Sequence, residues 1–340
     1  MKILLHTRFY PNVGGIETVA WLLAHEWQRQ GEQVTVVSDV VCPPEQRREL
    51  PFPVHYRPSI RCWLQLMRSA DVFVHMNLSL KALWPVLLVP RPLVAVHHGF
   101  YVVDRTGRQD WRERLKLKLM ARAANIAVSE AVARRLPVPC AVIPNPVDVS
   151  LFQTSQTTVR NRDLVFVGRL VSDKGAALLV QALDRLRQNG LTPQLTIIGD
   201  GPERAVLEQQ VAALKLSSQI HFTGSQPQAQ VAQRLRQHQI LVVPSLWEEP
   251  FGVVALEGAA CGCVVLGSDG GGLPEAIGPT GTTFKRGEVD DLVLKLSHLL
   301  RHPEVWSSYR AAAPAHWERH QPALIARRYL EVFGKQILER

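Results

Sequence analysis

The sequence has no long hydrophobic run. Its 340 residues include no stretch of about 18 consecutive apolar residues, the length needed to cross a bilayer. Residues 83–89 come closest, but this stretch is short and contains Pro85. The N-terminal residues 1–6 are too few for a signal peptide and show no cleavage site. We therefore expect them to form the first strand of a cytoplasmic protein.

Cysteine is also scarce. The five cysteines are odd in number and scattered, and the closest two are separated by one residue, which is not the spacing of a zinc site. A free cysteine packs as a small hydrophobic residue. We therefore expect a structural thiol at each of these positions: Cys42, Cys62, Cys140, Cys261 and Cys263.

Several catalytic signatures are missing. The histidines show no H-E-x-x-H spacing, and no G-x-S-x-G nucleophile elbow occurs. No D-x-D motif follows a predicted strand, and Asp290-Asp291 lies at the start of a predicted helix. The sequence therefore predicts neither a bound metal nor a serine nucleophile.

The composition is that of an ordinary globular protein, with 46% apolar and 20% charged residues. A chain of this length favours two domains. The net charge is +9, and the excess of cations gathers in residues 105–122. Such a segment attracts phosphates, anionic lipid or nucleic acid, whereas the plain alternative is a solvated helix face. Its cations are Arg105, Arg108, Arg112, Arg114, Lys116, Lys118 and Arg122.

Apolar runs alternate with amphipathic stretches along both halves of the chain. The predicted strands of the first half are residues 2–6, 34–38, 71–75, 93–97 and 125–129, and its predicted helices are 16–30 and 109–124. The predicted strands of the second half are 164–167, 195–199, 220–222, 240–243 and 263–267. Its predicted helices are 175–188, 202–214, 228–237, 252–260, 288–301, 303–313 and 317–338.

Strands separated by helices of this length indicate βαβ units and a parallel sheet. The alternation stops at Pro144-Asn145-Pro146-Val147-Asp148 and in the polar tract 153–162, which together form the best linker. The fold class is therefore α/β, with two doubly wound, Rossmann-like domains facing each other across a cleft. We place the first domain at residues 1–155 and the second at 160–316.

One segment, residues 244–257, has the features of a ligand site. The buried strand 240–243 leads into it, an acidic loop with Glu248, Glu249 and Pro250 follows, and a helix begins near Gly252. In open α/β sheets, ligands bind beyond the carboxyl ends of the strands. A helix N-terminus also presents unpaired N–H groups and partial positive charge to an anion.

Two glutamates of this segment, Glu249 and Glu257, are eight residues apart. A mostly helical interval would separate them by roughly 12 Å, further than the carboxylates of a hydrolytic pair. We therefore expect them to bind separate hydroxyl groups, Glu249 on a sugar and Glu257 on a ribose. The backbone N–H groups of Phe251, Gly252 and Val253 would hold phosphate between them. The alternative is an acidic surface loop and a solvated glutamate.

Two cations, Arg169 and Lys174, follow the first strand of the second domain in one loop. Two fixed cations at a strand end suit a diphosphate, because arginine can contact two oxygens at once. Two solvated charges are the plain alternative. Two glycine-rich turns, Gly199-Asp200-Gly201-Pro202 and Gly270-Gly271-Gly272, lack the third glycine of a dinucleotide fingerprint. Either is a turn or a place where a base or sugar approaches the backbone.

The first domain has two candidate elements of its own. Gly14-Gly15-Ile16-Glu17 lies between the first strand and the first helix and opens a second glycine-rich helix N-terminus. His97-His98-Gly99 ends the strand 93–97. A histidine pair at the carboxyl end of a strand is a candidate for function, although a lone histidine is more often structural.

Taken together, these motifs resemble the retaining, metal-independent glycosyltransferases of the GT-B fold, specifically family 4 (glycosyl transferases group 1). The likeness spans nearly the whole chain, and the motifs occur in the family's order. They are Gly14-Gly15-Ile16-Glu17, His98-Gly99, Phe166-Val167-Gly168-Arg169 with Lys174-Gly175, Gly199-Asp200-Gly201-Pro202, and the pair Glu249 and Glu257.

The resemblance implies that the second domain binds a nucleotide-diphosphate sugar and the first binds the acceptor. It implies Arg169 and Lys174 on the diphosphate, Glu249 on the donor sugar and Glu257 on the ribose. It also implies His98 near the reacting side of the sugar, the backbone of Gly15 by the phosphate, and a final helix, about 317–340, that crosses back to the first domain. The candidate donor-binding residues are Gly14, Gly15, Gly201, Phe251, Gly252, Val253 and Glu257.

The sequence departs from the family pattern in three places. Cys263 replaces a frequent proline, Pro146 replaces a glycine that is common after Asn145, and the segment after Glu275 is shorter. No charged site residue is lost. The shorter segment affects the region predicted to form the donor pocket.

Three functions fit these observations. The first is transfer of a sugar to a glycan or lipid-linked acceptor with retention of configuration and no metal or other cofactor. The second is an epimerase or phosphorylase, which requires acid and base groups around the sugar or a pyridoxal lysine. The third is a non-catalytic protein bound through residues 105–122 to the anionic inner face of a membrane. We expect no nucleic-acid partner, because no binding motif is present.

Overall fold

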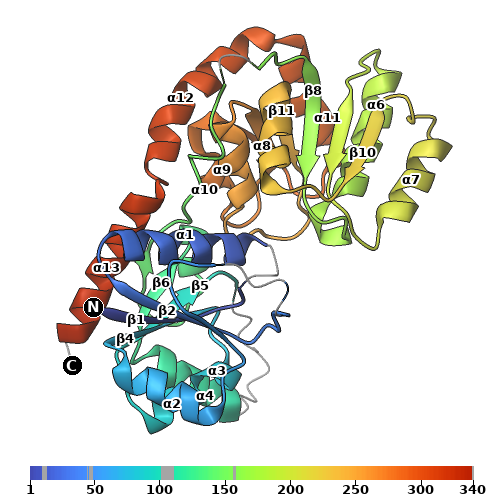
Figure 1. Ribbon diagram of the computed structural model, residues 1–340. Helices are drawn as coiled ribbons and strands as arrows, with labels where there is room; N and C mark the ends of the chain where they lie inside the picture. Colours follow the sequence, from blue (N-terminus) through green and yellow to red (C-terminus); the bar gives the residue numbers. More distant parts are fainter. Residues whose placement is uncertain (10–13, 44, 46–48, 101–110, 156–157, 339–340) are drawn as a thin grey trace. The chain divides into compact units, whose positions relative to one another are not determined.

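The computed structural model describes residues 1–9, 14–43, 45, 49–100, 111–155 and 158–338. The chain divides into two compact units (Figure 1). Unit 1 consists of Met1–Pro146 and His320–Arg340, and unit 2 of Val147–Arg319. The division lies between Pro146 and Val147, inside the predicted proline-rich linker, whereas the sequence placed it at residues 155–160.

Unit 1 is built on a parallel sheet with the strand order β3-β2-β1-β4-β5-β6-β7. Every residue of β4 and β5 is buried, as in parallel sheets covered on both faces. The first strand pairs with two neighbours, so that Leu4 lies opposite both Thr35 and Phe73. The strands are β1 (Lys2–His6), β2 (Gln33–Ser38), β3 (Val54–Tyr56), β4 (Val72–Met76), β5 (Leu93–His97), β6 (Ala124–Ala127) and β7 (Ala141–Val142).

Helices cover both faces of this sheet (Figure 1). One face carries α1 (Gly15–Arg29) and the C-terminal α13 (Pro322–Leu338), and the other carries α2 (Ile60–Ser69), α3 (Leu80–Leu88) and α4 (Trp111–Met120). The short α5 (Glu130–Ala133) follows β6. Trp27 of α1 is fully buried, donates a hydrogen bond to the Ala326 carbonyl oxygen at 3.2 Å and packs edge-on against Phe333. The final helix is thereby fixed to the first helix of the chain.

Unit 2 repeats this plan with the strand order β10-β9-β8-β11-β12-β13, all parallel. Its strands are β8 (Arg162–Val167), β9 (Leu195–Ile198), β10 (Ile220–Gly224), β11 (His238–Val243), β12 (Val264–Ser268) and β13 (Gly281–Phe284). One face carries α6 (Ala176–Gln188), α7 (Arg204–Ala213) and α11 (Val289–Arg301). The other carries α8 (Gln228–Gln237), α9 (Val253–Ala260), α10 (Leu273–Ile277) and α12 (Trp306–Glu318).

The core of unit 2 shows why the apolar runs of the sequence become strands. Leu164 and Phe166 of β8 point to one face and pack with Leu183 of α6 and Leu296 of α11. The intervening Val165 is also fully buried, on the other face. Burial on both faces requires a nearly continuous apolar strand.

The helices and strands differ from the expected ones in several places. The predicted C-terminal helix 317–338 begins later than expected, because Trp317 and Glu318 still belong to α12 and α13 begins at Pro322. Proline has no N–H group and disfavours helical geometry in the residue before it, so a helix restarts there. The sequence pattern also left α2, α3 and β13 unassigned. No helix among the described residues has both the length and the hydropathy to cross a membrane.

The five cysteines are unpaired, and Cys42, Cys261 and Cys263 are buried. Burial raises the pKa of the Cys263 thiol to about 11, so it stays protonated at neutral pH. The Arg160 guanidinium lies against this thiol and also donates to the Cys261 carbonyl oxygen at 2.6 Å. Cys261 and Cys263 therefore lie in the packed interior next to the end of α9.

Candidate active site

The strand order of unit 2 reverses between β8 and β11. The chain leaves β8 toward β9 on one side and leaves β11 toward β12 on the other, so the loops that follow these two strands diverge. Such a switch point leaves a crevice at the carboxyl ends of the strands, where ligands bind in doubly wound sheets. Arg169 and Lys174 follow β8, and Ser245 and Glu249 follow β11.

Lys174 and Glu249 meet at this point. The Lys174 Nζ atom lies 2.6 Å from Glu249 Oε1, and the two side chains are 26% and 12% exposed. Ser245 Oγ donates to the same oxygen at 2.7 Å. The sequence pattern assigned these two charged residues to different parts of a donor, and the fold brings them into direct contact.

Arg169 is exposed, and none of the described residues forms a hydrogen bond or ion pair with its side chain. The loop that carries it is held close to β11 by Gly175. That glycine has φ 71°, and a Cβ atom there would overlap the carbonyl oxygen of Pro244. Only glycine combines this backbone conformation with this close approach. The loop that carries Arg169 and Lys174 is thus held against the end of β11.

Helix α9 begins at the same place. Gly252 is its N-cap in the left-handed conformation, and the helix starts at Val253, one residue later than expected. The first N–H groups of a helix have no partner within it and attract anions. Phe251 is buried as a whole residue, with 2% of it exposed, whereas Gly252 and Val253 are partly exposed. The arrangement suits the phosphate contact predicted for these backbone groups.

The glycine-rich turn after β12 fastens the backbone of Glu249. Gly272 N–H donates to the Glu249 carbonyl oxygen at 2.7 Å, and Glu249 also forms an isolated bridge with Gly271. Next to it, Arg286 Nη1 lies 3.3 Å from Glu248 Oε1. The triple glycine was the signal for this contact in the sequence, but it was interpreted only as a turn or a ligand approach.

Glu257 lies in α9 and is half-buried. Burial, and then the nearby carboxylate of Asp148, raises the pKa of its carboxyl group to about 7. Asp148 itself accepts hydrogen bonds from the backbone N–H groups of Ser150 and Leu151 at 3.0 and 3.3 Å. The separation expected from the sequence assumed a mostly helical interval, but Glu249 precedes the helix. The helical rise therefore applies only from Val253 to Glu257.

The turn after β9 packs against the turn after β8. A Cβ atom at Gly201 would overlap the carbonyl oxygen of Leu170, so this glycine has a packing reason independent of any ligand. Leu170 N–H in turn donates to the Asp200 carbonyl oxygen at 2.9 Å. Ligand binding at Gly201 remains a prediction.

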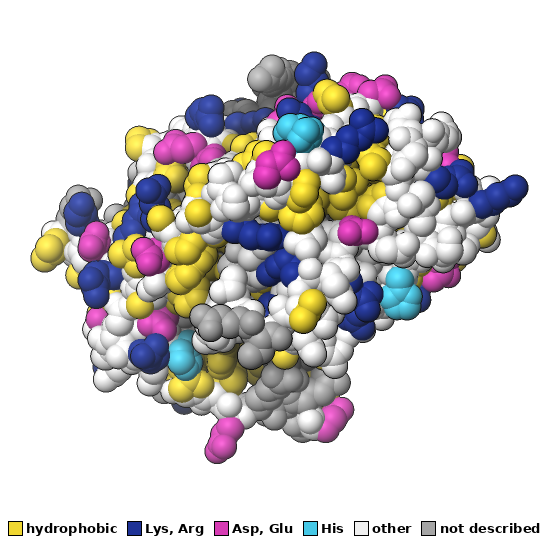
Figure 2. All heavy atoms as spheres, turned by 90° about the horizontal axis from the view of Figure 1, so that it is seen from above, with side chains coloured by type: hydrophobic (Ala, Val, Ile, Leu, Met, Phe, Trp, Pro, Cys, Tyr) yellow, Lys and Arg dark blue, Asp and Glu magenta, His cyan; other side chains and the backbone are white. Residues whose placement is uncertain are grey.

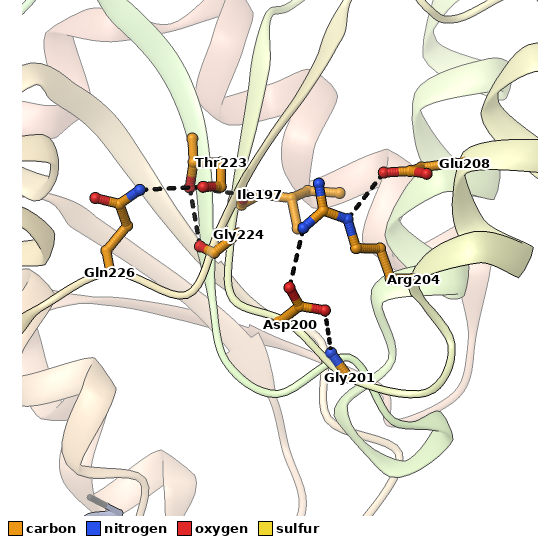
Figure 3. A network of polar contacts seen from close by, with 8 residues as sticks. All are labelled: Ile197, Asp200, Gly201, Arg204, Glu208, Thr223, Gly224 and Gln226. Carbon is orange, nitrogen blue, oxygen red and sulfur yellow. Dashed lines mark hydrogen bonds and ion pairs between the residues drawn. The ribbon is translucent and has the colours of Figure 1, made fainter.

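Figure 3 shows the polar network around this turn. Asp200 accepts from Gly201 N–H at 2.8 Å and from Arg204 Nη1 at 3.0 Å, and Arg204 Nε donates to Glu208 Oε1 at 2.9 Å. Arg204 is the first residue of α7, which therefore begins two residues after the expected Pro202. The network joins the end of β9 to the first two turns of this helix.

In unit 1, the histidine pair at the end of β5 is buried. His97 Nε2 lies 3.0 Å from Asn125 Oδ1, and burial lowers its pKa to about 4. Burial lowers the pKa of His98 to about 3, and its ring Nε2 has no hydrogen-bond partner among the described residues. The backbone N–H of His98 donates to Asn77 Oδ1 at 3.0 Å. Asn77, which follows β4, is a contact that the sequence pattern did not indicate.

The glycine-rich start of α1 is occupied by an acidic side chain. Gly14 is the N-cap, Gly15 is the first helical residue, and Glu17 lies in the first turn. The Glu17 Oε2 atom would lie 2.6 Å from a Cβ at Gly14, so the carboxylate folds back over the helix N-terminus. A phosphate can therefore contact the backbone of Gly15, as predicted, only if the Glu17 carboxylate moves away from the helix N-terminus or shares its N–H groups with the phosphate.

Part of the basic segment 105–122 lies outside the described residues. Among its described residues, Trp111–Met120 form α4, which ends four residues before the end of the expected helix 109–124; residues 109 and 110 lie outside the described residues. Leu119 and Met120 are buried, while Arg112, Arg114, Lys118 and Arg122 are exposed.

On the molecular face drawn in Figure 2, cationic side chains are mixed with anionic and hydrophobic ones. The part of the chain that the structure describes contains no cluster of three or more His, Cys, Asp or Glu suited to a metal.

Two doubly wound units, one of which gathers cations, a glutamate and a helix N-terminus at its switch point, define a class of fold. This is the two-domain, Rossmann-like GT-B fold. The solved structure of HepE from Anabaena, determined in complex with UDP, has the same fold, with a TM-score of 0.83 and 21% sequence identity. The similarity covers 98% of this chain and 100% of that one.

Family models identify the chain more closely. Residues 13–151 match the model described as Glycosyltransferase Family 4, and residues 151–316 match Glycosyl transferases group 1. Together, the two matches cover residues 13–316 without a gap. The chain belongs to the family 4, group 1 glycosyltransferases, as the motifs of the sequence indicated.

Two curated relatives are of the same kind. The chain is 30% identical over 216 residues to an MMP alpha-(1->4)-mannosyltransferase of Mycolicibacterium hassiacum, and the match covers 63% of this chain and 51% of that enzyme. It is 24% identical over 317 residues to a phosphatidylinositol N-acetylglucosaminyltransferase chain of Arabidopsis thaliana, covering 84% and 71% of the two chains. The chain thus spans about half the length of the first relative.

Proposed function

We propose that the protein transfers a sugar from a nucleotide-diphosphate sugar to an acceptor hydroxyl, with retention of anomeric configuration and without a metal. The supporting observation is the switch point of unit 2. There, Arg169, which has no partner among the described residues, the Lys174–Glu249 pair and the N-terminus of α9 lie at the ends of two neighbouring strands. These groups are complementary to a diphosphate joined to a hydroxyl-rich ring.

Each of these groups has a role in the proposed reaction. Arg169, Lys174 and the N–H groups at the start of α9 bind the diphosphate, and they stabilise the negative charge that develops as it leaves. Glu249 accepts hydrogen bonds from the donor sugar, and Glu257 accepts them from the ribose. The relatives support the donor class, because one is named a mannosyltransferase, another an N-acetylglucosaminyltransferase, and HepE was solved with UDP.

Retention is proposed to occur by attack of the acceptor on the same face that the leaving group departs from. Glu249 is held by Lys174 and Ser245, which leaves it a binding group rather than a free nucleophile. Unit 1 is proposed to bind the acceptor. His98 of that unit, a neutral imidazole near the reacting side of the sugar, is the proposed unit 1 contribution to catalysis.

A thermal-shift screen with UDP-glucose, UDP-N-acetylglucosamine, ADP-glucose and GDP-mannose tests the donor class, because a specific ligand stabilises the fold by mass action. Turnover of the best ligand is then followed by NMR, in which the anomeric signal of the product reports retention or inversion. Activity that persists in EDTA supports metal independence. Full turnover by an Arg169→Ala variant would count strongly against the proposed site.

An epimerase of the same fold is the alternative reaction. Incubation with the donor and no acceptor separates the two, because an epimerase changes the sugar while it stays attached to the nucleotide. A new nucleotide sugar in the NMR spectrum would favour the epimerase. Release of free sugar and nucleotide diphosphate would favour the transferase, with water replacing the acceptor.

A second proposal concerns the acceptor side. Trp111 is 65% exposed at the start of α4, and Arg112, Arg114 and Lys118 are exposed on the same helix. Basic side chains beside an exposed tryptophan suit an anionic lipid surface that carries a lipid-linked acceptor, at the cytoplasmic face of a membrane. Co-sedimentation with vesicles of phosphatidylcholine, with and without phosphatidylglycerol, tests this. Equal binding to both would remove the idea.

A further inference from the structure

We propose that Ser245 is a positioning residue for donor binding. It fixes one carboxylate oxygen of Glu249 together with Lys174, and it leaves the other oxygen to the donor sugar. The proposal rests on the function proposed above and adds to it a residue that the sequence motifs did not single out.

The geometry assigns the two oxygens of Glu249 different roles. Both Lys174 Nζ, at 2.6 Å, and Ser245 Oγ, at 2.7 Å, bind Oε1. No described residue forms a hydrogen bond to Oε2. An ionised carboxylate offers about four lone-pair sites, so Oε2 keeps its full capacity to accept from sugar hydroxyls.

The backbone of the loop is already fixed between Ser245 and Glu249 and at Glu249 itself. Leu246 and Trp247 N–H groups donate to the Asp173 carbonyl oxygen at 2.8 and 3.1 Å. Gly272 N–H holds the carbonyl oxygen of Glu249 at 2.7 Å. The remaining freedom of Glu249 is therefore in its side-chain torsions, and the contacts at Oε1 restrict them.

Ser245 supplies a restraint that Lys174 cannot supply alone. The lysine ammonium is a point charge on a flexible stem and has three donors, so it can turn toward a diphosphate when a donor arrives. Ser245 is 1% exposed and carries a short side chain, so its hydroxyl cannot follow. The hydroxyl therefore holds Glu249 in place while Lys174 also contacts the diphosphate.

The experiment compares Ser245→Ala, Ser245→Cys and Ser245→Thr with the wild type. Donor turnover is measured as kcat/KM for UDP-glucose and GDP-mannose, and the affinities for UDP and GDP alone are measured by calorimetry. We expect Ser245→Ala to lower kcat/KM about 10- to 100-fold, as for loss of one hydrogen bond to a charged group, and to change the affinity for the bare diphosphate less than about twofold.

The other two variants distinguish the effect of the hydroxyl group from the effect of side-chain volume. Cysteine keeps the size of serine but is a weak donor, so Ser245→Cys should resemble Ser245→Ala. Threonine keeps the hydroxyl, so Ser245→Thr should recover most of the turnover. Ser268 is the matched control, because it is also fully buried at a strand end and its Oγ has no hydrogen-bond partner among the described residues. Ser268→Ala should turn over the donor normally.

Two results would overturn the positioning role. One is normal turnover by Ser245→Ala. The other is an equal loss of affinity for the bare diphosphate, which would indicate a general disturbance of the loop. The proposed function fails separately, if the wild type neither binds nor turns over any nucleotide sugar of the screen. Loss of turnover in Glu249→Gln together with normal turnover in Ser245→Ala would reject the positioning role and keep the function.

Discussion

Replacing Glu257 by glutamine tests the electrostatics of α9. The pKa of its carboxyl group is raised from 4.5 to about 7 by burial and by Asp148. Between these two values the folded protein keeps a proton that the unfolded chain has lost, so the stability of unit 2 falls as the pH rises through this window. Above about pH 7 the folded protein carries the buried charge and the loss is complete. Glutamine is neutral at every pH, so the Glu257→Gln variant does not lose this stability.

The shift from 4.5 to about 7 corresponds to at most about 3.5 kcal/mol, at about 1.4 kcal/mol for each pKa unit. Glu257 is half-buried rather than fully enclosed, and solvent screens part of the effect. We therefore expect Glu257→Gln to gain about 1.5 kcal/mol at high pH. For a unit of this size, that gain raises Tm by about 3–6 °C.

The assay is thermal unfolding of the wild type and Glu257→Gln between about pH 4.5 and pH 8.5. The difference in Tm should be small at the acidic end and should grow until about pH 7. Glu318→Gln is the control, because Glu318 is exposed at the end of α12 in the same unit and should show no such trend. A difference in Tm that is independent of pH, or a less stable variant at pH 8.5, would refute the reasoning. Asp148 is a poorer target, because it also caps the turn at Ser150 and Leu151.

Three further predictions concern the remaining site residues. Arg169→Ala should leave Tm unchanged, because its side chain has no partner among the described residues, but it should weaken binding of a nucleotide diphosphate about 10- to 100-fold by calorimetry. Gly175→Ala should cost about 3 kcal/mol or more in urea unfolding because of its φ of 71° and the overlap with Pro244, whereas Gly190→Ala, at φ 76° with open space, should cost about 1 kcal/mol. Because the pKa of His98 lies at about 3, a His98→Asn variant should lower turnover without moving any inflection of the pH profile between pH 5.5 and 8.5; a shifted inflection would show that His98 titrates there.

The local pattern of the sequence was sufficient to predict the α/β class and most strands. Strands β1 and β5 have the predicted bounds, because buried parallel strands are apolar on both faces and stand out in the sequence. Shorter elements were less visible. The edge strand β3 and the four-residue β13 carry too few apolar residues for a periodic signal, and the proline of α3 obscured a helix.

The family was also readable from the sequence, because its motifs are short, local and ordered along the chain. The candidate residues Arg169, Lys174, Glu249 and Glu257 were selected as residue types next to predicted strand ends. Strand ends of a parallel sheet meet at one edge, so it was possible to expect these side chains near one another without knowing the strand order.

The sequence alone therefore determined the class of fold, the family and the chemical character of the switch point. Only the tertiary structure decided which groups come together: Lys174 and Ser245 on one oxygen of Glu249, Asp148 near enough to Glu257 to raise its pKa, Gly175 against Pro244, and the Asn77 side chain on the backbone N–H of His98. Most of these partners are far apart in the chain and come from different strands. Their contacts follow from strand order, loop closure and left-handed glycines, which no local hydrophobic pattern encodes.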